Sequence, residues 1–332
     1  MVKWLGFLPA PMHGLIAVQR DKLLRAIQVI QEVLAGSLTV DRYRSLMGFL
    51  EHLKLLVDRP KARTAHLYRP LQSGQEIDSG PATLVRVDQL MRDSFTEWLT
   101  VLSSTAIAPV SYALPRARRT PVTGMCFFFS SDAAKEGTPT PALAGYMHGM
   151  YWQLFFPPEW HALHITLLEF LALAMSVIIF APYLEKVPSV VIETDSLSAS
   201  FVLSEASARS PPLYLAHSLL LDTPEYSELL GGVRAWRQVS VGHIHGPANI
   251  AADHLSRGNI LAFHTLCVNL GVRPRRLLIP LAARHYLHTF FERAAPYLPP
   301  ELYALGRSPA AVAYDGPPVS YTHLTLPTIY SV

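Results

Sequence analysis

The sequence is poor in the residues that stabilise small secreted domains. Only two of its 332 residues are cysteines, Cys126 and Cys267, so a framework of several disulfides is excluded. Their spacing does not match a structural zinc site either. Cysteines used as small core residues are typical of a reducing compartment, and we therefore expect an intracellular, cytoplasmic protein, with a particle or the nucleus as alternatives.

Long apolar segments are also missing. Residues 1–7 lack the apolar core of a secretory signal. An uncharged run of 13 residues, 170–182, is too short to cross a bilayer, which takes about 20 residues. We expect this run to form a buried helix, and we expect no association with a membrane.

Net charge is small, at +3 for the whole chain. Two local arginine clusters, at 116–119 and 273–276, are its main basic features. Each is compatible with an anionic partner or with an ordinary solvated surface, and the sequence does not decide between them. Hydrophobic residues are plentiful, at 50%, and the length suffices for two domains with buried cores.

The first hundred residues favour helices, because apolar residues recur there at helical spacing. The expected helices cover 20–35, 39–57 and 85–102. A short strand at 4–7 is expected to have no partner nearby in the sequence. Polar or proline-containing segments predict linkers at 72–81 and 108–123.

From residue 125 the pattern changes to that of a sheet. Continuous apolar runs and a hairpin predict an α/β fold, with a mixed five-stranded sheet flanked by helices. The expected strands cover 125–130, 142–147, 150–156, 188–195 and 233–244. The expected helices cover 164–183, 199–205, 213–221 and 250–257.

Four acidic residues occupy notable places in these elements. Asp132 and Asp195 follow two of the strands. Glu169 lies in the apolar helix, and Asp253 lies in the first turns of the last helix. Each alone could be a surface carboxylate, although an unpaired glutamate in an apolar helix is costly. Carboxylates gathered at one end of a sheet need cations, and their oxygens favour two Mg²⁺ ions, with Mn²⁺ as an alternative.

The last of these acids lies in a distinctive stretch, His243 to Arg257. It reads His-Ile-x-Gly-x-x-Asn-x-x-Ala-Asp-x-Leu-Ser-Arg, and Asn249 is the expected N-cap of the helix. The pattern resembles the last catalytic segment of type 1 ribonuclease H, in the version fused to reverse transcriptases of retroelements. Retrotransposons of the long-terminal-repeat or tyrosine-recombinase type carry such enzymes.

The resemblance implies a ribonuclease H-like fold and metal-dependent cleavage of the RNA strand in RNA/DNA hybrids. By this resemblance, Asp132 would bridge both ions and Asp253 would hold the ion that activates water. Glu169 and Asp195 would hold the ion that faces the leaving group. His243 would assist proton transfer or product release.

The helices before residue 105 resemble, more loosely, the thumb and connection of these reverse transcriptases, and a generic helical hairpin is the alternative. The chain has no Tyr-x-Asp-Asp motif of a polymerase palm, so alone it should not synthesise DNA. The resemblance implies two partners, the RNA/DNA hybrid and the missing fingers and palm. Thr166 stands where the family often has asparagine, which would weaken contacts to the substrate backbone.

These observations divide the chain into five expected parts. They are thumb- and connection-like helices at 1–75, a helix and linker at 76–124, the ribonuclease H-like domain at 125–258, an extension of unassigned role at 259–318, and a final segment at 319–332. The final segment resembles translated sequencing adapter, so it is excluded from the fold prediction.

Three other functions were weighed against the nuclease. A catalytically inactive connection module that binds nucleic acid would have the same fold. A zinc site made of His243, His245 and His254 lacks a further ligand at a suitable spacing. A transposase or a proofreading exonuclease would order its acids differently, and Ala134 stands where the exonuclease has a glutamate.

Overall fold

The structure is a computed structural model, and it describes most of the chain between residues 7 and 310. The described residues are 7–10, 15–18, 20–36, 38–53, 64, 66–68, 84–104, 107–109, 126–205, 208, 210–230, 238–303 and 309–310. The expected linker at 72–81, the arginine cluster at 116–119 and the final segment at 319–332 lie outside them.

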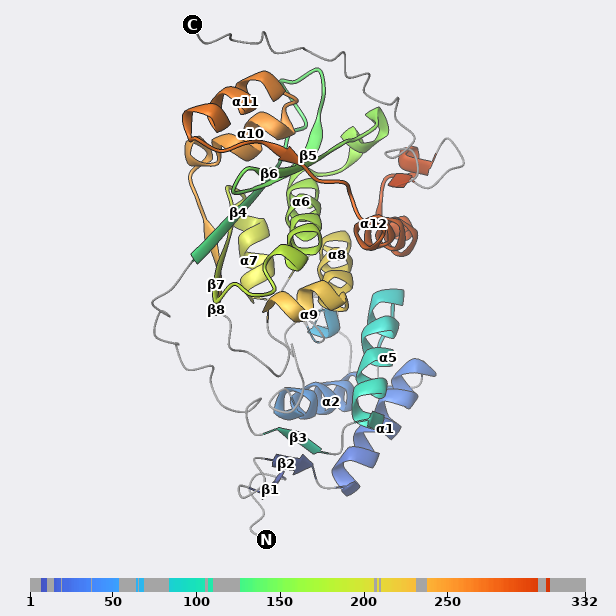
Figure 1. The fold of residues 1–332 in the computed structure, drawn as a ribbon. Helices are drawn as coiled ribbons and strands as arrows, with labels where there is room; N and C mark the ends of the chain where they lie inside the picture. Colours follow the sequence, from blue (N-terminus) through green and yellow to red (C-terminus); the bar gives the residue numbers. More distant parts are fainter. Residues whose placement is uncertain are drawn as a thin grey trace, which may run out of the picture.

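The N-terminal part forms a helical unit with its own core (Figure 1). It contains α1 (Arg20–Leu34), α2 (Val40–Leu53), the 3₁₀ helix η3 (His66–Tyr68) and α5 (Gln89–Ser104). The apolar faces of these helices meet around Tyr43, Phe95 and Trp98, which are fully buried. The hydroxyl of Tyr43 donates to the carbonyl oxygen of Leu67 at 2.6 Å, which joins α2 to η3.

Three short strands lie beside these helices and correct two predictions. β1 (Phe7–Ala10), β2 (Leu15–Val18) and β3 (Ile107–Pro109) pair antiparallel in that order. Of the strand expected at 4–7 only Phe7 is described, and it belongs to a strand that does have a partner close in sequence. The expected linker at 108–123 begins later than predicted, because residues 107–109 pair with β2.

The helical unit contacts the rest of the chain through α5 and through η3, where the ring centroid of His66 lies 3.8 Å from that of Tyr214. Ser94 and Tyr214 share a buried hydrogen bond of 2.9 Å between their hydroxyl groups, and Ser218 lies 3.4 Å from a carboxylate oxygen of Glu97. Leu23 and Ile27 pack within the helical core and not against the strands of the main sheet.

The main sheet has six strands, in the order β8-β7-β4-β5-β6-β9. β5 pairs antiparallel with both β4 and β6, whereas β7 is parallel to β4 and β8, and β9 is parallel to β6. The strands are β4 (Cys126–Ala133), β5 (Ala142–Met147), β6 (Met150–Phe155), β7 (Ser189–Thr194), β8 (Gln238–His243) and β9 (Arg275–Arg276). The prediction of a mixed α/β sheet is confirmed, but the count of five strands was wrong, because β9 comes from the C-terminal extension.

α6 (Ile165–Phe180) is the central helix beneath the sheet (Figure 1). Thirteen of its residues are buried, which confirms the predicted buried helix. Residues 165–183 are long and apolar enough to cross a membrane by length and composition alone. However, 78% of an apolar 18-residue stretch within them is buried inside the protein. Trp152 on β6 donates from Nε1 to Oγ of Ser176 at 3.1 Å, which fixes the helix to the sheet.

Between β7 and β8 the described residues form three helices, where two were predicted. They are α7 (Leu197–Glu205), α8 (Pro211–Leu221) and α9 (Pro224–Leu230). α9 has only seven residues, too few to reveal a helical period in the sequence. β8 is described from Gln238 onward, and residues 231–237, which include the first part of the strand predicted at 233–244, lie outside the described part of the chain.

The chain after β8 wraps around the β6 edge of the sheet. α10 (Ile250–Ser256) and α11 (Ile260–Asn269) cover one face, where Phe263 and Cys267 pack with Tyr151. β9 then pairs with the edge strand β6, and α12 (Leu281–Ala294) packs on the other face against α6 and α8. We call residues 260–294 the edge clasp. The remaining short helices are η6 (Pro158–Ala162), η7 (Ala181–Tyr183), η8 (Gly246–Ala248), η9 (Ala295–Tyr297) and η10 (Pro300–Tyr303).

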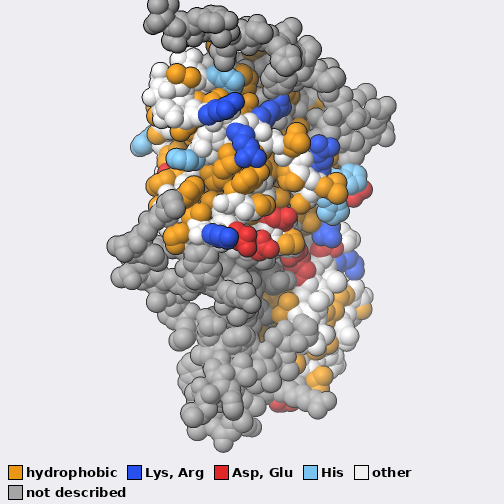
Figure 2. All heavy atoms as spheres, viewed as in Figure 1, with side chains coloured by type: hydrophobic (Ala, Val, Ile, Leu, Met, Phe, Trp, Pro, Cys, Tyr) orange, Lys and Arg blue, Asp and Glu red, His pale blue; other side chains and the backbone are white. Residues whose placement is uncertain are grey.

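The outer surface of the edge clasp is partly apolar. Leu261, Val268, Leu278 and Leu281 are each at least 73% exposed. Figure 2 shows hydrophobic side chains lying between Lys and Arg side chains on the upper part of the molecule in this view. Arg275 and Arg276 of β9 are exposed as well, so the predicted basic cluster at 273–276 lies at the surface.

Candidate active site

The site is built at the carboxyl ends of two neighbouring parallel strands. Ser131 of β4 is in register with Thr194 of β7, so Asp132 and Asp195 follow side by side. Carboxyl ends of parallel strands are where α/β folds commonly place polar groups that bind ligands. The sheet topology thus brings together two acids that are far apart in the sequence.

Asp132 is the most buried of the predicted site residues, with 7% of its surface exposed. Burial and then the charge of Asp195 raise the pKa of its carboxyl from 3.8 to about 6, and the charge of Asp253 adds to the rise. The Ser256 hydroxyl, whose oxygen lies 2.5 Å from Oδ2, lowers the pKa in part. Asp132 therefore sits where negative charge is costly and already concentrated.

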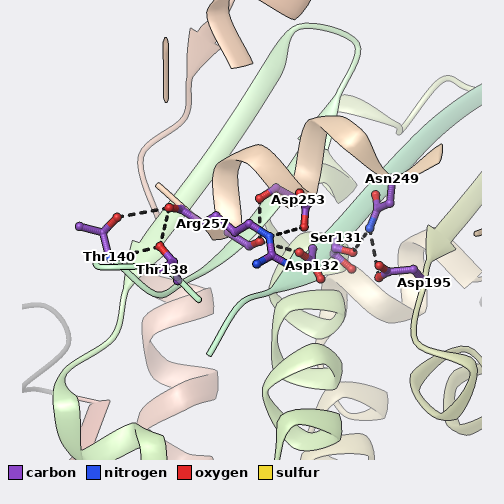
Figure 3. A network of polar contacts seen from close by, with 9 residues as sticks. Ser131, Asp132, Thr138, Thr140, Asp195, Asn249, Asp253 and Arg257 are labelled. Atoms are coloured by element: carbon purple, nitrogen blue, oxygen red, sulfur yellow. Dashed lines mark hydrogen bonds and ion pairs between the residues drawn. The ribbon is translucent and has the colours of Figure 1, made fainter. Parts of the chain in front are cut away.

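Asp253 approaches Asp132 from α10, which crosses the same face of the sheet (Figure 3). The helix is fixed to β6 because Nε2 of Gln153 donates to the carbonyl oxygen of Leu255 at 2.6 Å. Its small buried residues, Ala251 and Ala252, let the helix lie close to the strands. Asp253 forms an ion pair of 2.6 Å with Arg257 one helical turn later.

Glu169 belongs to the same site but approaches from α6. Burial raises the pKa of its carboxyl, a hydrogen bond with Ser196 lowers it, and the charge of Asp195 raises it again. The charge of Asp195 thus acts on both Asp132 and Glu169, and the charge of Asp253 acts on Asp132, so the four predicted acids lie in one region of negative charge.

Asn249 corrects one prediction about this group. It occupies the N-cap position of α10, as expected, but its side chain makes no capping hydrogen bond. Its Nδ2 instead donates to the carbonyl oxygen of Ser131 at 3.0 Å and to Oδ1 of Asp195 at 3.2 Å (Figure 3). Asn249 therefore ties β4, β7 and α10 together and orients Asp195.

His243 lies at the exposed rim of the site. Its Nε2 is 3.0 Å from the carbonyl oxygen of Asp195, so the imidazole rests against the strand end that carries an acid. His245 is its neighbour, with 6.2 Å between the ring centroids. In the described part of the chain no three His, Cys, Asp or Glu side chains are close enough together to hold one metal ion. A zinc site made of these histidines is not formed, and the predicted ligands Asp132, Glu169, Asp195 and Asp253 do not meet as a metal-binding cluster either.

Sequence reasoning missed the roles of Ser256 and Arg257. Both belong to the Leu-Ser-Arg end of the motif, which follows Asp253. They supported the resemblance to ribonuclease H, but no contact with the acids was predicted for either of them. On a helix, residues three and four positions after Asp253 lie on its own side, so the spacing alone could have indicated them.

The residues of the site fit a hydrated divalent cation. Mg²⁺ binds through one or two carboxylates and keeps several waters, so it does not need three protein ligands. One buried oxygen beside the acids, Oδ1 of Asn249, has no hydrogen-bond partner among the described residues. It can accept a hydrogen bond from water bound to such an ion, and the acids near Asp132 supply the negative charge.

Comparisons with known proteins give little further information. No family model matches the chain, and no curated protein matches it. Among solved structures, a ribonuclease H1 from the halophilic archaeon Halobacterium salinarum is similar at 17% identity and a TM-score of 0.30. The match covers 40% of this chain and 94% of that protein.

Proposed function

We propose that the unit from β4 to α10 is a metal-dependent endonuclease that hydrolyses the RNA strand of RNA/DNA hybrids. One observation carries the proposal. The carboxyl of Asp132 is buried, and this burial together with the charges of Asp195 and Asp253 raises its pKa to about 6. Such a group is costly to bury unless cations bind to it, and perturbed acids in a shared site are typical of catalysis.

Divalent ions bound there would activate water and stabilise the charge on the leaving 3′-oxygen. The protein's own residues would position the acids. Asn249 holds Asp195, and Ser256 holds Asp132, each by a hydrogen bond to a carboxylate oxygen. His243 is exposed beside Asp195 and so suits proton exchange with solvent.

The proposed substrate and partners follow from the resemblance in the sequence. A hybrid duplex offers 2′-hydroxyl groups on one strand and a deoxyribose backbone on the other, which allows recognition by shape. The exposed arginines of β9 add positive charge that suits a phosphate backbone. The helical unit would be the thumb and connection of a retroelement reverse transcriptase, with the fingers and palm as its partner.

The test is cleavage of a labelled RNA/DNA hybrid by the wild-type protein and by Asp195→Asn. Asparagine keeps the volume of the side chain but removes the charge, so cleavage in Mg²⁺ should fall by a factor of about 10² to 10³ or more. Binding of the hybrid in EDTA should hardly change, because it depends on basic groups meeting phosphates. Asp222→Asn, at the exposed end of α8, is the matched control and should cleave like wild type. Equal cleavage by all three proteins would contradict the proposal.

A catalytically inactive module that binds nucleic acid is the second candidate. One observation favours it, namely that the charge of Asp253 is already balanced by Arg257 through an ion pair of 2.6 Å. The same assay separates the two functions, because an inactive module would bind the hybrid in EDTA and would not cleave it in Mg²⁺ or Mn²⁺.

A further inference from the structure

Arg257 places a positive charge inside the group of acids. It follows α10 directly, and its Nε lies 2.6 Å from Oδ1 of Asp253. Figure 3 shows its side chain directed toward the carboxylates of Asp253 and Asp132. The pKa of the guanidinium is raised, first by the hydrogen bond to Asp253 and then by the charges of Asp253, Asp132 and Asp195. Arg257 thus forms an ion pair with Asp253, and its positive charge is also felt by Asp132 and Asp195.

The backbone of Arg257 is held in place while its side chain keeps access to solvent. Its carbonyl oxygen accepts hydrogen bonds from Thr138 at 2.7 Å and Thr140 at 3.4 Å, both in the loop between β4 and β5. The side chain of Arg257 is 41% exposed. The guanidinium can therefore leave Asp253 by rotating into solvent, without any movement of α10.

We propose that Arg257 is the counter-cation of the acidic group in the metal-free protein and that it competes with divalent ions for Asp253. The inference rests on the proposed function, because it requires that Asp253 helps to hold an ion. A guanidinium and a metal ion held by the same carboxylate repel each other, because both are cations, so binding of either one weakens binding of the other. Arg257 is accordingly a positioning residue, which keeps the acids together until metal replaces it.

Thermodynamic linkage gives the direction of the expected effect. Removing Arg257 destabilises the metal-free protein, which loses its counter-cation, more than the metal-bound protein, which has already released the side chain. The apparent Kd for Mg²⁺ should therefore fall by about two- to five-fold, the range expected from a partly exposed ion pair on one helix.

The experiment measures the thermal unfolding midpoint against Mg²⁺ concentration, at constant ionic strength and without nucleic acid. Wild type is compared with Arg257→Gln and with Arg257→Lys, which keeps the positive charge. Arg257→Gln should have the lower midpoint without metal and should reach half of its total rise at a lower Mg²⁺ concentration. Arg257→Lys should stay close to wild type, which separates the loss of charge from the loss of packing.

Arg44→Gln is the matched control, because Arg44 forms an exposed ion pair with Asp41 on α2, in the helical unit. It should leave the Mg²⁺ dependence unchanged. Identical Mg²⁺ curves for wild type and Arg257→Gln would overturn the role of Arg257 alone. If the unfolding midpoint did not change with Mg²⁺ for any of the proteins, both this inference and the metal-dependent function would be overturned. If the midpoints responded to Mg²⁺ as expected but the wild-type protein did not cleave the hybrid, only the proposed nuclease activity would fail, and the competition between Arg257 and Mg²⁺ would stand.

Discussion

Replacing Asp132 with asparagine should stabilise the protein at neutral pH in the absence of divalent ions. The carboxyl of Asp132 is 7% exposed, and burial beside Asp195 raises its pKa from 3.8 to about 6. The folded protein therefore holds this proton more tightly than the unfolded chain does. Stability is lost as the pH rises from about 3.8 to about 6, because ionisation is easier in the unfolded chain.

The magnitude follows from the size of this shift. One pKa unit corresponds to about 1.4 kcal/mol, so an ionised Asp132 lowers the free energy of unfolding by about 3 kcal/mol above pH 6. Asparagine carries no charge at any pH and avoids this loss. The gain of Asp132→Asn should be about 3 kcal/mol at pH 7 and should shrink below about 1 kcal/mol at pH 4.

Urea unfolding in EDTA, followed by tryptophan fluorescence at pH 4 and pH 7, measures both values. Asp222→Asn serves as the control, since Asp222 is exposed, and should change stability by less than about 0.5 kcal/mol at either pH. Adding Mg²⁺ should reduce the advantage of Asp132→Asn, because the ion stabilises only the wild-type carboxylate. A variant that is less stable than wild type at pH 7, or a gain that is equal at both pH values, would refute the reasoning.

Two further predictions test the supports of the site. Asn249→Ser keeps a good N-cap residue but loses the bridge to Ser131 and Asp195. It should lower the free energy of unfolding in urea by about 1–2 kcal/mol, as much as Asn249→Ala does. A serine variant as stable as wild type would show that capping is the main role of Asn249. Gly258→Ala should lower the free energy of unfolding by about 2 kcal/mol or more, because Gly258 has φ +72° and a side chain there would collide with Thr140. Gly271→Ala is the control, since Gly271 has φ +67° but open space around it, and should lower that free energy by only about 1 kcal/mol. Equal losses of stability in the two variants would refute the collision.

Elements with a long apolar pattern were predictable from the sequence. α6 lies within the predicted helix at 164–183, and β5 and β6 match their predicted strands to within one residue. Their residues are buried on the sheet, so packing and sequence pattern agree. β9 was not predictable, because its two residues are exposed arginines whose pairing depends on the edge strand β6 being next to them.

The acids of the site were predictable for a related reason. Asp132 and Asp195 end apolar strands, and parallel pairing of those strands brings them together. The contacts that orient these acids were not predictable in the same way. Asn249 was expected to cap its helix, and only the approach of α10 to both strands decides that it bridges Ser131 and Asp195 instead.

The edge clasp has a consequence during synthesis on the ribosome. All the acids of the site precede residue 258, so the strands that carry them emerge before β9 does. At about 5–20 residues per second, the outer edge of β6 stays open for a matter of seconds. An open strand edge can pair with another chain, so neighbouring nascent chains on one messenger RNA are at risk of joining through β6. When residues 275–276 arrive, they pair with Met150 and Tyr151 and close that part of the β6 edge, so we expect the extension to have a use in folding that is separate from the chemistry of the acids.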